Sequence, residues 1–253
     1  MESQFSPTAR DYATSPTHAN ADDLKRLVNL VQPKKSDSLL DIATGAGNVA
    51  LAFAPFVSRV VAYDLTASML EETHRRAEEL GYGHLTVVQG PAEELPFEDG
   101  SFEIVTVRTA PHHFSNIQAA VSEMARVTRP GGTVLIVDTC SPEDDEADSA
   151  LNDFERLRDR SHVRNYRPSE WGEMVEAAGL TLRRLEVADH GGGKKLNFRL
   201  WCDRMRVDDA TREELERRLD LASGALREVL KPEIVDGERW FTLPEITLLA
   251  TKG

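Results

Sequence analysis

The chain has 253 residues, of which 40% are hydrophobic, so it is long enough to bury a core of ordinary size. Its 43 acidic and 30 basic residues give a formal net charge of -13, which argues against a broad phosphate-binding face and so against nucleic acid as a partner. No apolar run approaches the roughly 18 residues of a membrane span, the N-terminus lacks the layout of a signal peptide and only two cysteines are present, so we expect a globular cytoplasmic protein.

Short apolar runs alternate along the chain with longer segments of helical period. Seven runs are predicted strands: 38–43, 59–64, 84–89, 102–107, 133–138, 182–187 and 245–251. Most are almost continuously apolar, as in parallel strands that are covered on both faces. The pattern therefore predicts an α/β protein with a doubly wound sheet, whose ligand lies beyond the carboxyl ends of the strands.

The segments between the strands carry recognisable helix signals. A stripe of apolar residues at helical spacing predicts the first helix: Leu24, Leu27, Val28 and Val31. Three residues are predicted N-caps: Thr66, Ser115 and Thr211. Gly81 offers a left-handed stop for the helix that Thr66 begins, and the helix that Thr211 begins is expected to keep one buried face as far as Val229.

We expect one domain over 1–253, with three segments added to the sheet. The segment 1–35 is predicted to supply an N-terminal cover and a helix, and the part before Asn20 to act as a mobile lid. Segments 141–167 and 190–243 are longer than a connection needs, which is typical of lids and substrate-binding insertions. The glycine run 191–193 is interpreted as a hinge into the second insertion.

A glycine turn between a strand and a helix is the strongest chemical feature. The apolar run ends in Thr44-Gly45-Ala46-Gly47, in which Gly45 permits the turn and Gly47 lets a ligand approach the backbone. The next strand ends at Asp64, nineteen residues after Gly45, where a carboxylate can accept both hydroxyls of a ribose. The pair predicts a cofactor that contains a nucleoside.

Two cofactors fit the glycines, because the spacing also matches the dinucleotide fingerprint of nicotinamide enzymes. Asp41, at the end of the first strand, would lie near a cationic amino group and would repel a pyrophosphate. No tyrosine has a lysine four residues later, the pair found in many short-chain reductases. Both observations favour S-adenosylmethionine, with a nicotinamide-dependent reductase and a noncatalytic S-adenosylmethionine-binding regulator as the alternatives.

At this point the chain resembles a known family, the class I S-adenosylmethionine-dependent methyltransferases, and in particular the branch of ubiquinone and menaquinone biosynthesis. Six motifs carry the likeness in order: 41–47, 61–64, 90–97, 101–105, 112–114 and 126–132. The resemblance implies a Rossmann-like, mostly parallel sheet of seven strands with the last one antiparallel. It also implies S-adenosylmethionine as cofactor and transfer of its methyl group to a small-molecule acceptor.

The same likeness assigns site residues. Asp64 would hold the ribose, Leu65 and Met69 would pack near the adenine, the Ala92 backbone would meet the adenine edge, and Arg108 would face the methionine part. The expected cofactor-binding set is Asp41, Ala43, Gly45, Gly47, Asp64, Leu65, Met69, Ala92, Glu93 and Arg108. Many relatives carry Asp where this chain has Pro91, so Glu93 is expected to take over the contact with the adenine amino group.

Catalysis of methyl transfer rests largely on alignment, because the sulfonium is already an activated leaving group. A base is needed only for an acceptor atom of high pKa, and His113 and His112 stand just after the fourth strand, where such a base would act. One of the two rings is equally well explained as a structural side chain. We expect no metal, and the acceptor, the methylated atom and the oligomeric state stay open.

Two further features have open interpretations. The arginine-rich stretch 156–164 either attracts an anionic acceptor or forms a solvated face paired with acidic neighbours. Four large side chains in the second insertion either line a substrate pocket or form a small core: Trp201, Met205, Trp240 and Phe241.

Overall fold

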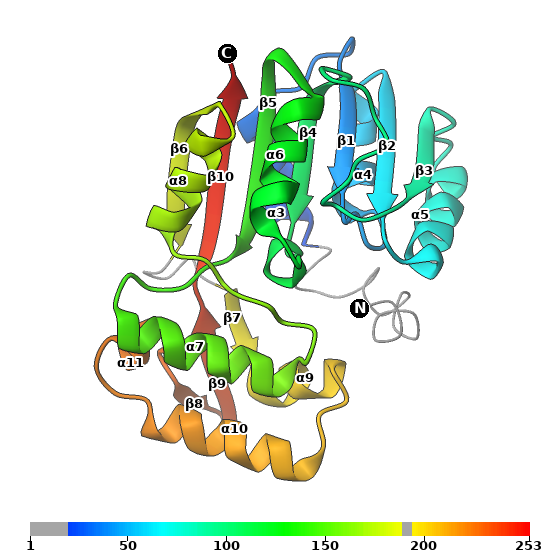
Figure 1. The fold of residues 1–253 in the computed structure, drawn as a ribbon. Coiled ribbons are helices and arrows are strands. Elements are labelled where there is room, and N and C mark those ends of the chain that lie inside the picture. The colour runs from blue at the N-terminus through cyan, green and yellow to red at the C-terminus, as the bar shows by residue number, and fades with distance from the viewer. Residues whose placement is uncertain (1–19, 189–193) are drawn as a thin grey trace. The chain divides into compact units, whose positions relative to one another are not determined.

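The computed structural model describes residues 20–188 and 194–253 (Figure 1). These residues form two compact units. The first unit comprises the described residues up to 137 together with 174–184 and 248–253, and the second unit comprises 138–173 and the described part of 185–247. The predicted lid before Asn20 and the predicted glycine hinge at 191–193 lie outside the described residues.

Seven strands form the main sheet, in the order β3-β2-β1-β4-β5-β10-β6. They are β1 (Ser38–Ile42), β2 (Arg59–Asp64), β3 (Leu85–Gln89), β4 (Phe102–Arg108), β5 (Thr128–Thr139), β6 (Leu180–Ala188) and β10 (Glu245–Lys252). The pairs among β1 to β5 are parallel, and β10 runs opposite to β1 and β2 in Figure 1. The predicted seven-stranded, mostly parallel sheet is therefore confirmed.

Strand β1 lies between two parallel neighbours, and all five of its residues are buried. Leu40 is in register with Val61 of β2 and with Val105 of β4. Strand β5 begins at Thr128, earlier than predicted, because Thr128 already pairs with Phe102 before the register shifts at the glycines. The buried position of β1 brings its carboxyl end, and the turn that follows it, to the middle of the sheet edge.

Helices of the sheet region follow the predicted pattern. They are α3 (Ala21–Val31), α4 (Asn48–Phe53), α5 (Ala67–Glu79), α6 (Ile117–Val127) and α8 (Pro168–Ala177), with short 3-10 turns η2 (Ala54–Phe56) and η3 (Pro111–His113). The apolar stripe of α3 is confirmed, since Leu27 and Val28 are buried in one cluster with Leu39 and Phe53. No helix in the described ranges is both long and apolar enough to cross a membrane.

Two of the predicted helix starts are wrong, and one is confirmed in part. Thr66 takes the N-cap position of α5 without a capping hydrogen bond from its side chain, and the positive φ of Gly81 follows the helix. Asn116, not Ser115, caps α6, because the Ser115 hydroxyl is bound to a carboxylate elsewhere. Asp208, not Thr211, caps the helix α10 (Asp209–Leu221), since its carboxylate reaches the N–H of Thr211 at 2.9 Å.

The second unit contains further helices and a small antiparallel sheet. The helices besides α10 are α7 (Asp145–Arg158), α9 (Phe198–Arg204) and α11 (Gly224–Leu230), and the strands β7 (Lys194–Asn197), β8 (Glu233–Val235) and β9 (Glu238–Leu243) pair in the order β7-β9-β8. The single helix predicted from Thr211 to Val229 is wrong. The chain breaks at Ala222 and Ser223, and α11 restarts at Gly224 with φ +51°.

Aromatic side chains form the core of the second unit. Trp201 stacks on Phe154 with 5.2 Å between the ring centroids and meets Phe241 edge-on at 4.9 Å. All three rings are buried, with leucines from α7 and α10 around them. For Trp201 and Phe241 these contacts favour the core interpretation.

Replacing Trp201 with Ala should lower the free energy of unfolding by about 3 to 5 kcal/mol, because it removes a large ring from a packed core. Leu200→Ala is the matched control on the same helix. Its side chain is 55% exposed, so the change should stay within about 0.5 kcal/mol. Chemical denaturation of both variants measures the difference, and equal losses would contradict the position assigned to the Trp201 ring.

Candidate functional site

The turn between β1 and α4 is built from backbone conformations that favour glycine. Gly45 has φ +55° and Gly47 has φ +81°. A Cβ on Gly47 would lie 2.6 Å from Cγ2 of Thr73, so close packing against α5, as well as the positive φ, excludes a side chain there. A Cβ on Gly45 would meet no atom within 4 Å. The open side of the turn is therefore at Gly45.

Two residues other than glycine share the left-handed conformation at this sheet edge. Ala43 directly follows β1 with φ +50°, and Thr109 directly follows the neighbouring strand β4 with φ +55°. Such conformations cost of the order of 1 to 3 kcal/mol and gather at binding and catalytic sites. The strained positions thus mark the carboxyl ends of β1 and β4 as the candidate site.

Asp41 holds the turn from inside the fold. Its Oδ2 accepts hydrogen bonds from the Thr44 hydroxyl at 2.6 Å and from the Ala50 N–H at 3.1 Å, and its Oδ1 accepts one from the Thr106 hydroxyl at 2.7 Å. Burial raises the pKa of this carboxyl from 3.8 to about 6, although the three hydrogen bonds favour the ionised form. The carboxylate therefore joins β1, the turn, α4 and β4. Its predicted contact with a ligand stays a prediction.

Asp64 closes the turn from the end of β2. Its Oδ2 accepts the N–H of Gly45 at 2.8 Å, and its Oδ1 accepts the N–H of Thr66 at 2.8 Å. The side chain is 8% exposed, and burial raises the pKa of the carboxyl. The Thr66 hydroxyl and the Leu65 N–H are further donors that favour the ionised carboxyl. The ribose contact predicted for Asp64 stays a prediction.

Helix α5 supports the turn through two residues that the sequence did not reveal. The Thr73 hydroxyl donates to the Gly45 carbonyl at 2.8 Å. Arg76 donates to the Ala46 carbonyl and, at 2.9 Å, to the side chain of Asn48. The spacing of three puts Thr73 and Arg76 on one face of α5. In the sequence, however, polar residues at that spacing cannot be told from a solvated helix face.

The segment after β3 is seated on Tyr63. The Gly90 N–H donates to the Asp64 carbonyl at 3.1 Å, and a Cβ on Gly90 would overlap the Tyr63 hydroxyl. That hydroxyl donates to the Pro91 carbonyl at 3.1 Å. Ala92 follows and is buried. The backbone predicted to meet the adenine edge is thus held in place by a tyrosine of the neighbouring strand.

Glu93 connects the segment after β3 to the segment after β4. Its Oε1 accepts the Ser115 N–H at 2.9 Å, the Ser115 hydroxyl at 2.7 Å and the Asn116 N–H at 3.3 Å. Burial opposes ionisation, but these donors outweigh it and lower the pKa of the carboxyl. One oxygen of Glu93 is therefore committed to a structural contact. A contact between Glu93 and an adenine amino group stays a prediction.

The two histidines follow β4 on the 3-10 turn η3. His112 is 8% exposed, whereas His113 is half-buried, and their ring centroids lie 4.1 Å apart. Arg108, also half-buried, ends β4. Within residues 20–188 and 194–253, no three His, Cys, Asp or Glu side chains gather in a way that could hold a metal ion.

The other predicted cofactor contacts lie where β2 passes into α5. Leu65 directly follows Asp64 and is 37% exposed, whereas Met69 lies in the first turn of α5 and is 4% exposed. Asp64 and Leu65 thus share one strand end with the turn at Gly45. A thioether as buried as that of Met69 offers little surface to a ligand in this conformation.

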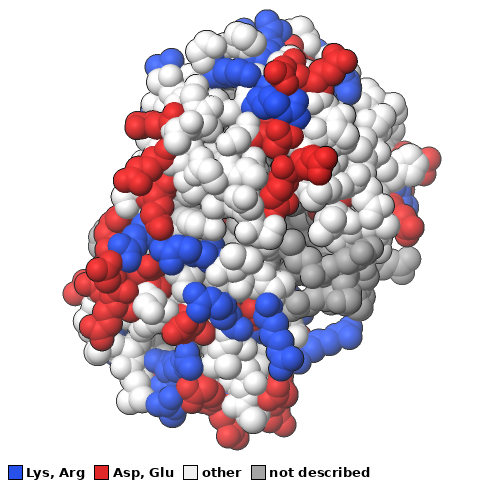
Figure 2. Space-filling model, viewed as in Figure 1, with Lys and Arg blue, Asp and Glu red and all other residues white. Residues whose placement is uncertain are grey.

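Two of the four arginines in the stretch 156–164 form ion pairs. Arg156 contacts Asp153 at 2.6 Å, and Arg164 contacts Asp148 at 3.1 Å and Glu170 at 3.0 Å. On the face drawn in Figure 2, basic and acidic side chains are mixed. For Arg156 and Arg164 these contacts favour the interpretation as a paired face over an acceptor site, whereas Arg158 lies over the ring of Trp201, 4.4 Å from its centroid.

Several known proteins are similar to this chain in sequence and in structure. Residues 40–136 match the family described as the methyltransferase domain. The uncharacterized methyltransferase YcgJ of Bacillus subtilis is 40% identical over 185 residues, which is 73% of each chain. Its crystal structure has a TM-score of 0.84 at 33% identity and covers 91% of this chain and 98% of that one.

Two more comparisons agree. A solved structure from Bacillus halodurans C-125 has a TM-score of 0.85 at 39% identity, over 92% of this chain and 99% of that one. The ubiquinone/menaquinone biosynthesis C-methyltransferase UbiE of Hahella chejuensis is 38% identical over 109 residues, 42% of this chain and 44% of its own length. The chain belongs to the methyltransferase family, as an S-adenosylmethionine-dependent enzyme of the Rossmann-like fold.

Asp41→Asn tests the buried carboxyl through its pH dependence. Because the pKa is raised to about 6 in the folded state, the stability linked to Asp41 is fully present below pH 3.8 and is lost as the pH rises through about 6. By pH 7 the loss amounts to about 3 kcal/mol. The variant should lack this fall between about pH 4 and pH 6.

Denaturant unfolding at several pH values gives the required slopes. The exposed Asp22→Asn serves as control and should keep the slope of the parent chain. If Asp41→Asn unfolds with the same pH dependence as the parent, burial does not raise the pKa of the Asp41 carboxyl in the way described.

Proposed function

We propose that the chain transfers the methyl group of S-adenosylmethionine to a small-molecule acceptor. The observation that carries the proposal is the Asp64 carboxylate at the end of β2, which accepts the N–H of Gly45 beside the open side of the turn. A nucleoside with two adjacent hydroxyls can donate to such a carboxylate. The open side of the turn at Gly45 gives such a ligand access to the backbone.

The neighbouring residues fit the rest of this cofactor. Leu65 offers an apolar surface directly after Asp64, and Met69 lies nearby in the first turn of α5. The Ala92 backbone, which follows the segment held by Tyr63, is suited to the adenine edge. Gly45, with Ala43 and Arg108 at the ends of β1 and β4, is proposed to face the methionine part. We keep Glu93 as the proposed partner of the adenine amino group through its second oxygen.

Charge favours the same cofactor. When bound, S-adenosylmethionine supplies a methyl group on a positively charged sulfur, which leaves as a neutral thioether. Asp41 and Asp64 put two buried carboxyls beside the turn. Burial raises the pKa of both, and the charge of Asp64 raises the pKa of Asp41 further. A cationic ligand nearby would lower that cost, whereas a pyrophosphate would increase it. This supports a methyl donor over a nicotinamide cofactor.

The residues after β4 are proposed to serve the acceptor. The half-buried His113 has more access to a ligand than His112, which is almost fully buried against it. We propose His113 as the base that takes a proton from the acceptor atom, with His112 as the second candidate. The orientation of the His113 side chain is set by the turn η3 and not by α6, because α6 begins only at Ile117, after its N-cap Asn116.

Asp64→Ala should weaken binding of S-adenosylhomocysteine at least tenfold, because it removes two charge-assisted hydrogen bonds worth about 1.5 to 3 kcal/mol each. Asp64→Asn keeps the shape of the side chain and one acceptor oxygen, so its affinity should lie between those of the parent chain and Asp64→Ala. Calorimetric titration measures the affinities, and circular dichroism checks that each variant is folded. An unchanged affinity in folded Asp64→Ala would contradict the proposed ribose contact.

His113→Gln should lower turnover by about a hundredfold or more, and leave the affinity for S-adenosylhomocysteine nearly unchanged, if the ring acts as a base. The assay follows transfer of a labelled methyl group to a panel of small-molecule acceptors. His112→Gln is measured beside it, and His74→Gln, on the exposed face of α5, is the control. Full turnover in both η3 variants would show that the site works by positioning alone.

A further inference from the structure

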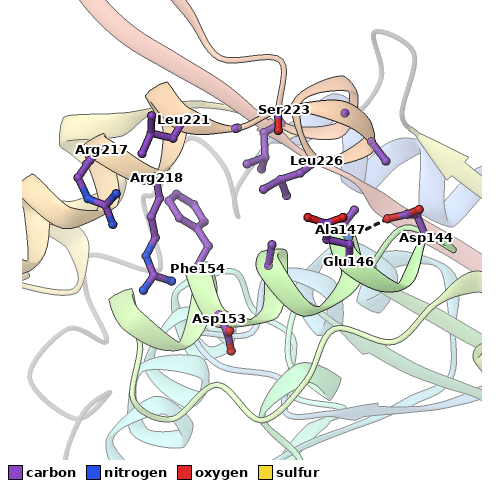
Figure 3. Close-up of a pocket in the computed structure, with 15 residues that line it drawn as sticks. Asp144, Glu146, Ala147, Asp153, Phe154, Arg217, Arg218, Leu221, Ser223 and Leu226 are labelled. Carbon is purple, nitrogen blue, oxygen red and sulfur yellow. Dashed lines mark hydrogen bonds between the residues drawn. The ribbon is translucent and has the colours of Figure 1, made fainter.

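The second unit contains a partly open cavity of about 580 Å³ between α7 and the pair α10 and α11 (Figure 3). Its lining comes entirely from residues 144–154 and 217–230, so it shares no residue with the glycine turn. The volume lies within the range of about 300 to 1,000 Å³ that is common for small-molecule sites. The cavity is therefore large enough to be a binding site of its own.

The middle of the cavity is apolar. Helix α7 contributes Ala147, Ala150 and Phe154, which follow one another on a single helix face. Leucines of α10 and α11 oppose them: Leu221, Leu226 and Leu230. The break between the two helices leaves Leu221 65% exposed at the edge of the cavity. An apolar ligand would remove this surface from water.

The two ends of the cavity carry opposite charge. Figure 3 shows the side chains of Arg217 and Arg218 at one end and those of Asp144 and Glu146 at the other. Asp153, near the arginines, is already paired with Arg156 at 2.6 Å. A ligand with one charged group therefore has only one favourable orientation in this cavity.

The arginine end has free capacity for an anion. Arg217 donates to both oxygens of Glu214 at 2.7 Å, and Arg218 uses only its Nε, at 2.8 Å, for the same carboxylate. Arg218 forms no other hydrogen bond or ion pair with the described residues. Two guanidinium groups around one carboxylate leave a net positive charge, and the terminal nitrogens of Arg218 have the planar geometry that binds carboxylates.

The acidic end is less suited to a cation. One oxygen of Asp144 is committed to the N–H of Ala147 at 2.9 Å, as the cap of α7. The first turn of a helix also carries partial positive charge, which disfavours a bound cation there. The balance of the two ends thus favours a ligand whose charged group is negative.

We propose that this cavity binds a small amphipathic carboxylic acid. Its carboxylate pairs with Arg218, and its apolar body packs against Ala150, Leu221 and Leu226. The site is separate from the methyl-donor site, and the inference does not depend on the proposed function.

Calorimetric titration of the full chain with decanoate below its micellar concentration tests the proposal directly. One molecule of decanoate should bind saturably, and decylamine, which has the same body and the opposite charge, should bind much more weakly. Absence of saturable decanoate binding, or equal affinity for the two compounds, would overturn the proposal.

Two variants locate the site. Arg218→Met keeps the length of the side chain and removes its charge, and it should weaken decanoate binding about tenfold or more. Ala150→Leu fills the cavity from a half-exposed helix position and should abolish binding. Arg199→Met, an exposed arginine of α9 outside the lining, is the control and should bind like the parent chain.

Thermal unfolding checks that each variant is folded. If either Arg218→Met or Ala150→Leu does not fold, the binding result of the other variant decides. Decanoate binding that stays unchanged in every folded cavity variant would place the ligand elsewhere and overturn the proposal.

Discussion

The buried carboxylate of Asp41 is the interaction on which the candidate site depends. It is bound at once by the Thr44 hydroxyl in the turn, the Ala50 N–H in α4 and the Thr106 hydroxyl in β4. Removing any charge from water is costly, and the raised pKa of Asp41 expresses that cost. The buried carboxyl therefore lowers the stability of the core once it is ionised, and its hydrogen bonds fix the position of the turn relative to β1 and β4.

The turn then fixes Asp64, because the Gly45 N–H points at one carboxylate oxygen while Thr66 occupies the other. Thr73 and Arg76 hold the carbonyl side of the same turn from α5. A site arranged in this way needs little reorganisation when a ligand arrives, which suits a reaction that depends on alignment. The left-handed conformations of Ala43 and Thr109 belong to the same constraint.

The sequence predicted those parts of the protein that depend on strong local signals. Continuous apolar runs such as that of β1 identify buried parallel strands, and the spacing of Gly45 and Asp64 identifies the candidate site. Helix caps were less predictable, because Ser115 and Asn116 offer adjacent acceptors and only the tertiary contact with Glu93 decides between them. Strand β8 has only three residues, and all of them are exposed. It therefore carries no alternation of buried and exposed positions that a sequence pattern could reveal.

The residues of α5 that hold the turn, and the cavity of the second unit, were not predicted for a similar reason. Thr73 and Arg76 become meaningful only when α5 packs against the turn, as the close approach of Thr73 to Gly47 shows. The cavity arises from the break between α10 and α11, whereas the apolar stripe that continues past Ala222 predicts one helix. Periodicity reports which residues share a face, but it does not report where a helix is interrupted.

We propose that the turn and Asp64 form a binding site for a sulfonium nucleoside and exclude a dinucleotide. Calorimetric titration of the purified chain with S-adenosylmethionine, S-adenosylhomocysteine and NADPH under one set of conditions tests it most directly. The two sulfur compounds should each bind saturably with one molecule per chain, and NADPH should give no saturable heat. Saturable binding of NADPH without binding of S-adenosylhomocysteine would contradict the account.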